Sequence, residues 1–217
     1  MSIPNWAKTY IRSEKLDDIH RAVKDAENKT AGEIVPMIVR KSSTIGHVPL
    51  LIMCLLVIGV LSLDLLVVEM TYFNNYYLWC FINFVVVIGL TTFLSRFDWI
   101  RRVLTNASDQ ISQVEMRAEV EFFEAGINQT RDATGVLLFI SVLERRAVVL
   151  ADKAIADKVP AETWDEICQI LVSGCKDKEV ERAFVEAISK CGDILKVHFP
   201  RKTDDINELS DQFIIKD

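Results

Sequence analysis

Three acidic side chains stand beside the ends of predicted strands, where they could together hold a hard cation. Asp132 precedes the apolar segment 136–142, and Asp152 follows a second short apolar segment, 147–151. Because strands joined by a tight turn run antiparallel and bring their outer ends together, we expect Asp132 and Asp152 to approach one another. Glu33, at the entry to an earlier strand, is the third candidate ligand. A hard divalent cation requires several such oxygen atoms, so these residues predict a metal site.

Each of these residues also has a purely structural interpretation. Asp152 could cap the short helical turn that follows it, and Asp132 could form an Asx-turn with the residues after it. Arg145 and Arg146, at the turn between the two strands, could hold a phosphate or simply face solvent. The sequence contains no nucleophile elbow, phosphate-binding loop or zinc-protease motif. We therefore assign no catalytic residue.

The composition argues against several other kinds of site and partner. A formal net charge of −6 is unsuited to nucleic acid, whose binding needs a clustered basic excess. The cysteines are odd in number and lack a CxxC pair, which fits neither a disulfide framework nor a zinc site. Cys168, Cys175 and Cys191 fall on the apolar faces of predicted helices and are interpreted as small core residues.

The elements that position these residues form two blocks around an apolar insertion. Before the insertion, the pattern predicts a helix over 14–28 and a strand over 33–39, in which Pro36 indicates a sheet edge or a bulge. After it we expect a long helix with one apolar stripe, which includes Val114, Ala118 and Phe122, and then the two strands. Two further helices follow, the last over 176–197, and then a polar tail over 200–217 that could dock through Phe213, Ile214 and Ile215. The first of the two strands is apolar at consecutive positions, which predicts helices on both faces. The fold class is therefore α/β, a small mixed sheet flanked by helices.

The insertion consists of two strongly apolar segments, 48–68 and 76–94. Each is close to the ~20 residues that cross ~30 Å of hydrocarbon as a helix, and two such segments are hard to bury in a small soluble domain. The connecting loop has no basic residue, whereas basic residues flank the pair, namely Arg40, Lys41, Arg96, Arg101 and Arg102. By the positive-inside rule, this pattern predicts a transmembrane hairpin with both termini in the cytoplasm.

Two stretches of the sequence resemble the TPM domain, a fold shared by a thylakoid lumenal protein and a photosystem II repair factor. AEVEFFEAGINQTRDATGVLLFISVLERRAVVLADKAI resembles the core of that domain, and IHRAVKDAENKTAGEIVPMIV resembles its opening helix and first strand. The resemblance implies an α/β sandwich with a central mixed sheet. The apolar insertion makes the chain most similar to a bacterial membrane-protein branch of the family. The first part of the domain is then expected at 1–45 and the second part at 98–199. The transmembrane hairpin is expected at 46–97 and the polar tail at 200–217.

The resemblance also implies what the chain does. Some TPM domains are acid phosphatases, some bind Ca²⁺ or Mg²⁺ through acidic loops, and others assemble or maintain membrane complexes. We expect a membrane-anchored scaffold or accessory factor that binds Ca²⁺ or Mg²⁺ through Asp132, Asp152 and Glu33. The alternative is a metal-assisted, acid phosphatase-like phosphomonoester hydrolase, which the missing nucleophile motif disfavours. The expected partners are the lipid bilayer, other membrane proteins and further copies of the chain. The expected location is the bacterial cytoplasmic (inner) membrane, crossed more than once.

Overall fold

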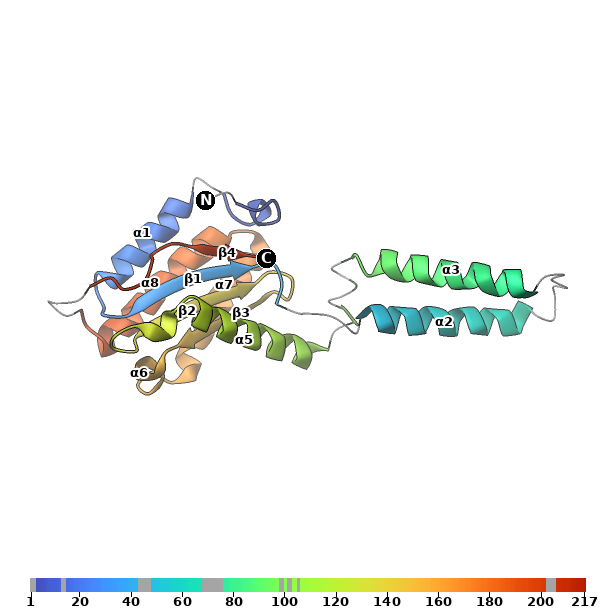
Figure 1. The fold of residues 1–217 in the computed structure, drawn as a ribbon. Coiled ribbons are helices and arrows are strands. Elements are labelled where there is room, and N and C mark those ends of the chain that lie inside the picture. The colour runs from blue at the N-terminus through green and yellow to red at the C-terminus, as the bar shows by residue number, and fades with distance from the viewer. Residues whose placement is uncertain are drawn as a thin grey trace. The chain divides into compact units, whose positions relative to one another are not determined.

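The computed structural model divides the chain into two compact units (Figure 1). One is formed by Met1–Ser43 with Ile111–Asp217 and holds a β-sheet, and the other, Thr44–Gln110, holds two apolar helices. The structure describes residues 3–12, 15–42, 48–67, 76–97, 100, 103–104, 106–201 and 206–217. The loop over 68–75, Arg101 and Arg102, which enter the predicted membrane topology, lie outside the described residues.

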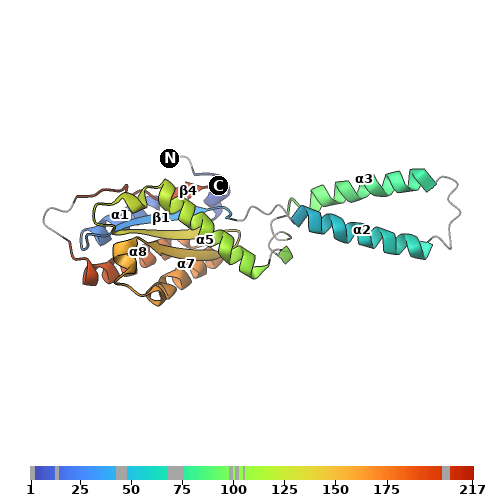
Figure 2. The ribbon, with the colours of Figure 1, turned by 60° about the horizontal axis from the view of Figure 1, so that its bottom comes forward.

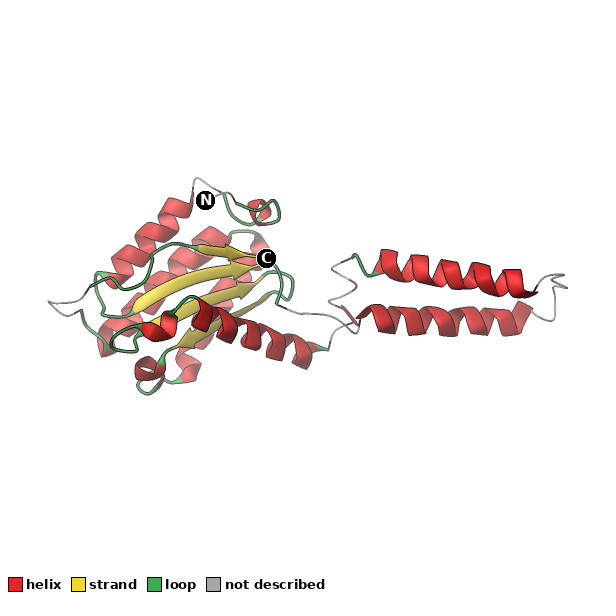
Figure 3. Cartoon of the chain, in the orientation of Figure 1, coloured by secondary structure: helices red, strands yellow, loops and turns green. Residues whose placement is uncertain are grey.

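A mixed four-stranded sheet forms the centre of the first unit, as the sequence predicts (Figure 3). Strand β1 (Glu33–Val39) runs parallel to β2 (Gly135–Ser141), and β3 (Arg146–Ala151) runs antiparallel to β2. The fourth strand, β4 (Ile214–Lys216), pairs in parallel with β1, so the order across the sheet is β3-β2-β1-β4. The predicted bounds of β1, β2 and β3 agree with the observed ones to within one residue at each end.

Helices lie on both faces of this sheet (Figure 2). One face is covered by α1 (Leu16–Glu27), α7 (Asp165–Asp177) and α8 (Val180–His198), and the other by α5 (Ala107–Glu124). The two helices predicted after the strands are α7 and α8, although the last one, predicted over 176–197, begins only at Val180 because α7 continues to Asp177. Short helical turns complete the unit at Ala7–Thr9, Ile127–Gln129, Lys153–Ala156 (α6) and Ala161–Trp164.

Strand β2 explains why the sheet needs cover on both sides. All seven of its residues are buried, and successive side chains point to opposite faces. Leu138 and Ile140 join the core beneath α1, α7 and α8, whereas Leu137 and Phe139 join the core beneath α5. The consecutive apolar residues of this strand therefore predict its burial correctly.

The C-terminal segment, predicted to be a polar tail that could dock through Phe213, Ile214 and Ile215, contributes a strand to the sheet. Ile214–Lys216 forms β4 beside the second half of β1, leaving Pro36 just beyond the paired stretch. This places Pro36 where β1 is an edge strand, as its missing N–H predicts. Phe213 is buried against Phe184 of α8, with the ring centroids 4.8 Å apart. The aromatic contact fixes the segment that leads into β4.

The second unit contains the two predicted apolar helices, α2 (Val48–Val67) and α3 (Tyr76–Leu94). They pack against one another, with Ile52 and Val87 buried. Within the described residues, one stretch, Tyr77–Leu94, is both long and apolar enough to cross a membrane, and the uninterrupted apolar stretch in α2 is shorter, Val48–Leu63. One such helix is weak support for membrane association, and a crossing by both helices stays a prediction.

Candidate functional site

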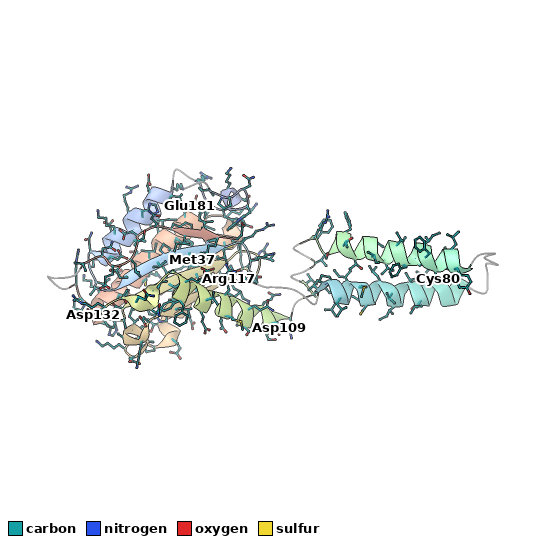
Figure 4. The ribbon with its side chains drawn as sticks, viewed as in Figure 1. Met37, Cys80, Asp109, Arg117, Asp132 and Glu181 are labelled. Atoms are coloured by element: carbon teal, nitrogen blue, oxygen red, sulfur yellow. The ribbon has the colours of Figure 1, made fainter. Side chains whose placement is uncertain are left out.

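The three predicted metal ligands lie at one end of the sheet, where β1 and β2 begin and β3 ends. The backbone N–H of Glu33 donates to the carbonyl of Thr134 at 3.1 Å, and that of Asp152 donates to the carbonyl of Gly135 at 2.8 Å. Asp132 precedes Thr134 by two residues and is labelled in Figure 4. The backbone segments that carry the three acids therefore lie side by side, as the hairpin geometry leads one to expect.

Asp152 acts as a helix cap. Its Oδ1 accepts a hydrogen bond of 2.7 Å from the backbone N–H of Lys153, at the start of α6. This is the structural alternative that the sequence offers for this residue. Its second oxygen, Oδ2, is buried without a hydrogen-bond partner in the described part of the chain. A buried carboxylate oxygen in this state is free to take a donor or a cation.

Asp132 and Glu33 have other contacts. Asp132 lies at the surface, and its carboxylate is 3.9 Å from the guanidinium of Arg131. Glu33 is buried, and its two oxygens accept the backbone N–H groups of Glu208 and Leu209, at 3.2 and 3.4 Å. Glu33 therefore attaches the segment before β4 to the start of β1, a contact between residues far apart in the sequence.

The donor set does not make a ready cage for a hard cation. Ca²⁺ takes six to eight oxygen ligands, and Mg²⁺ takes six in octahedral geometry. Among the described residues, no group of three or more His, Cys, Asp or Glu side chains could hold a metal ion. Of the three predicted ligands, Asp152 has a buried oxygen to offer, whereas Glu33 holds two backbone N–H groups. The Ca²⁺ or Mg²⁺ site stays a prediction, and no chemical step is derived through it.

Two of the three cysteines predicted to be core residues are buried. Cys175 and Cys191 are buried, and Cys168 is half-buried. Burial raises the pKa of the Cys191 thiol far above its usual range and also raises the pKa of Cys168. Since the thiolate is the nucleophile, these side chains are held in their unreactive form. Cys175 and Cys191 belong to the core beneath α1, α7 and α8, as predicted, whereas Cys168 lies outside that core cluster.

The most unusual surface of the first unit lies on α5. Its inner side buries Val114, Ala118 and Phe122 against the sheet, as the predicted apolar stripe requires. Its outer side exposes a second set of large apolar residues at spacings of four and three, namely Met116, Val120 and Phe123, which are 61%, 47% and 62% exposed. We call these three residues the outer stripe. Its helical spacing is visible in the sequence, but the longer inner pattern conceals it.

The fold defines a class of protein: a mixed α/β sheet with three helices on one face and one on the other. Residues 96–194 match the family model of the TPM domain. The match spans α5 to most of α8. It does not include α1 or the strands β1 and β4, which belong to the same sheet as β2 and β3.

A solved structure has the same fold. The NMR structure of the BA42 protein from the psychrophilic bacterium Bizionia argentinensis is similar with a TM-score of 0.58 at 20% sequence identity, covering 95% of this chain and 95% of that chain. At this identity, the likeness concerns the fold alone. No curated protein matches the chain in sequence.

Proposed function

We propose that the chain is a membrane-anchored TPM domain that acts as a scaffold or accessory factor by docking other membrane proteins. The observation that carries this proposal is the outer stripe of α5. Met116, Val120 and Phe123 are large apolar side chains on the solvent side of a helix whose other side already fills the core. A contiguous apolar ridge of this kind is typical of a protein-binding surface.

The charges around the outer stripe indicate which kind of partner would fit it. Glu115 and Glu119 flank it on one side of α5, and both are exposed. Glu124, on the other side, is paired with Lys216 at 3.0 Å. A complementary partner surface is apolar at its centre and carries Lys or Arg at its rim. A helix of a second membrane protein, with basic residues at its cytoplasmic end, has this composition.

The proposed anchor is the helix pair α2 and α3. Large apolar side chains such as Leu63, Phe81 and Phe84 are about 60% exposed within this unit. In water these side chains would be costly, whereas in hydrocarbon they require no further cover. We propose that both helices cross the bacterial inner membrane and that both termini are cytoplasmic, in agreement with the basic residues at 40–41 and at 96.

Site-specific photocrosslinking in native membranes tests the docking proposal. A benzophenone side chain at Val120 is expected to capture one or a few discrete membrane proteins, whereas the same group at the exposed Gln169 of α7 captures none. The Val120 crosslinks should weaken when Met116 and Phe123 are replaced with Ser. Equal capture from both positions would refute the docking surface. A crosslink to a second copy of the chain would identify a homo-oligomer as the partner.

A further inference from the structure

The turn between β2 and β3 carries two arginines beside a pocket. Arg145 and Arg146, together with Glu115 and Val148, line a cavity of about 320 Å³ between α5, β3 and α7. It lies at the end of β2 opposite to the three acids, since β2 begins beside Asp152 and finishes at Ser141. This pocket therefore plays no part in the predicted metal site.

Among the residues that the structure describes, both arginines lack a counter-ion. In the described residues, neither Arg145 nor Arg146 makes an ion pair or a side-chain hydrogen bond, and the Nε of Arg146 is buried without a partner. A buried guanidinium N–H without an acceptor is rare, because its lost hydration is not replaced. An acceptor supplied from outside the chain would satisfy it.

The backbone of the turn holds Arg145 in an unusual conformation. Its φ is 52°, in the left-handed region that favours Gly or Asn. The turn is closed by the N–H of Arg145 donating to the carbonyl of Val142 at 3.2 Å. A bulky charged residue at this position gains nothing from the local backbone, which indicates a role for its side chain.

The nearby acid at this turn is already engaged. Glu144 is buried, and its carboxylate accepts hydrogen bonds from the Ser141 hydroxyl and, at 3.2 Å, from the backbone N–H of Ser42. The N–H of Leu143 donates to the carbonyl of Arg40 at 3.0 Å, which brings the exposed Arg40 and Lys41 beside the same turn. The turn itself therefore presents positive charge to solvent, and Glu115 of α5 is the carboxylate that lines the same pocket.

We propose that Arg145 and Arg146 bind the headgroup phosphate of an anionic phospholipid. A phosphate oxygen pair matches the planar fork of a guanidinium and would accept the unpaired N–H of Arg146. A lipid source is favoured by the chain itself: five residues, 43–47, separate Ser42 from Val48 of the proposed anchor, and such a linker reaches at most about 20 Å. This inference rests on the proposed membrane anchoring.

Hydrogen–deuterium exchange of the full-length chain in lipid nanodiscs tests this assignment. In discs that contain phosphatidylglycerol, the amides over 142–147 are expected to exchange severalfold more slowly than in discs of phosphatidylcholine alone, because arginines bound to an anionic surface would hold the turn closed. The double variant Arg145→Gln/Arg146→Gln should lose this difference. The matched control Arg131→Gln/Lys153→Gln removes the same charge at the opposite end of the sheet and should retain it.

The possible results separate this proposal from the anchoring on which it rests. Incorporation is read independently, as co-elution of the chain with the discs. A chain that co-elutes but exchanges equally in both lipids refutes the phosphate assignment alone. A chain that does not incorporate refutes the anchoring, and the lipid assignment with it. Slower exchange with inorganic phosphate but not with phosphatidylglycerol would refute the lipid source. If the control variant loses the difference between the two lipids equally, the effect depends only on net charge, and the assignment of the phosphate to this pocket is refuted.

Discussion

The Nζ of Lys216 lies 2.5 Å from the Oε2 of Glu121 and joins the last strand of the sheet to α5. Glu121 is only 1% exposed, and its other oxygen is 2.7 Å from the guanidinium of Arg117 on the same helix. Figure 4 labels Arg117 on α5, near Met37 of β1. The buried carboxylate therefore has two cationic partners, one from its own helix and one from β4, and it attaches β4 to the helix that carries the outer stripe.

Replacing Lys216 with Met should lower the free energy of unfolding by about 1–2 kcal/mol. This is less than the full cost of breaking a buried ion pair, because Lys216 is partly exposed and Arg117 remains beside Glu121. Equilibrium urea unfolding of the full-length chain in mild detergent measures it. As the control, Lys190→Met removes a surface pair with Glu166 and should cost less than about 0.5 kcal/mol. Equal effects would mean that Glu121 does not depend on β4.

The contribution of Lys216 should disappear at high pH. Burial lowers the pKa of Lys216, but its hydrogen bonds with Glu121 and Glu124 outweigh burial and raise it overall. Because the pKa of Lys216 is higher in the folded chain, its protonated form stabilises the fold at pH values below the unfolded pKa of about 10.4. This stabilisation is lost as the pH rises through the pKa of the folded chain. The difference in unfolding free energy between the wild type and Lys216→Gln should thus be constant from neutral pH to about pH 10 and then shrink. A difference that grows above pH 10 would contradict this assignment.

The two sides of α5 should respond oppositely to a charge. Val120→Glu, on the outer stripe, should change the unfolding free energy by no more than about 0.5 kcal/mol and yet abolish crosslinking from neighbouring positions. Ala118→Glu places the same charge in the core beneath the helix and should cost on the order of 3 kcal/mol or more. Urea unfolding and crosslinking yield measure the two effects. A Val120→Glu variant that unfolds would show that the outer stripe is structural.

Two substitutions of Asp152 distinguish its role as the cap of α6 from a role as a cation ligand. Asp152→Ala should cost about 1 kcal/mol, whereas Asp152→Asn keeps the acceptor for the Lys153 N–H and should cost a few tenths. Thermal unfolding compares the two variants. A rise in melting temperature with Ca²⁺ or Mg²⁺ that Asp152→Asn removes would instead make Asp152 a cation ligand, and would justify assays of phosphomonoester hydrolysis.

Glycine at position 145 should stabilise the turn between β2 and β3, because Arg145 has a positive φ. Arg145→Gly relieves a left-handed φ and should raise the unfolding free energy by up to about 1 kcal/mol, whereas Arg145→Ala should not. Both variants remove one of the two guanidinium groups at the pocket, so both should weaken the response to phosphatidylglycerol. Greater stability together with lost lipid dependence would show that this arginine is kept for binding.

Elements with their own periodic pattern could be predicted from the sequence. Strands β1, β2 and β3 have strong consecutive or alternating apolar residues, and the inner stripe of α5 follows helical spacing. Strand β4 has only three residues, and its pairing with β1 makes it a strand. The break between α7 and α8 depends on Lys178, at φ 59°, where the usual Gly or Asn signal is absent.

The sequence predicts where the candidate site residues lie in the sheet, but it does not predict which groups their side chains contact. The spacing of the strands locates Asp132, Asp152 and Glu33 at one end of the sheet. What each carboxylate contacts depends on distant segments, since the backbone partners of Glu33 come from residues 208 and 209. The unpaired state of Arg146 likewise depends on α5 and α7 packing beside the turn. Local patterns contain no information on these contacts.

The parallel pairing of β1 with β2 has a consequence for biosynthesis. Glu33 pairs with Gly135, so about a hundred residues must leave the ribosome between the two strands. The apolar helices are made within this interval, and β1, all of whose residues end up buried, has no neighbour until translation has passed residue 141. Delivery of the helices to a translocon would therefore precede assembly of the sheet, and β1 is the segment that a nascent-chain chaperone would have to protect meanwhile.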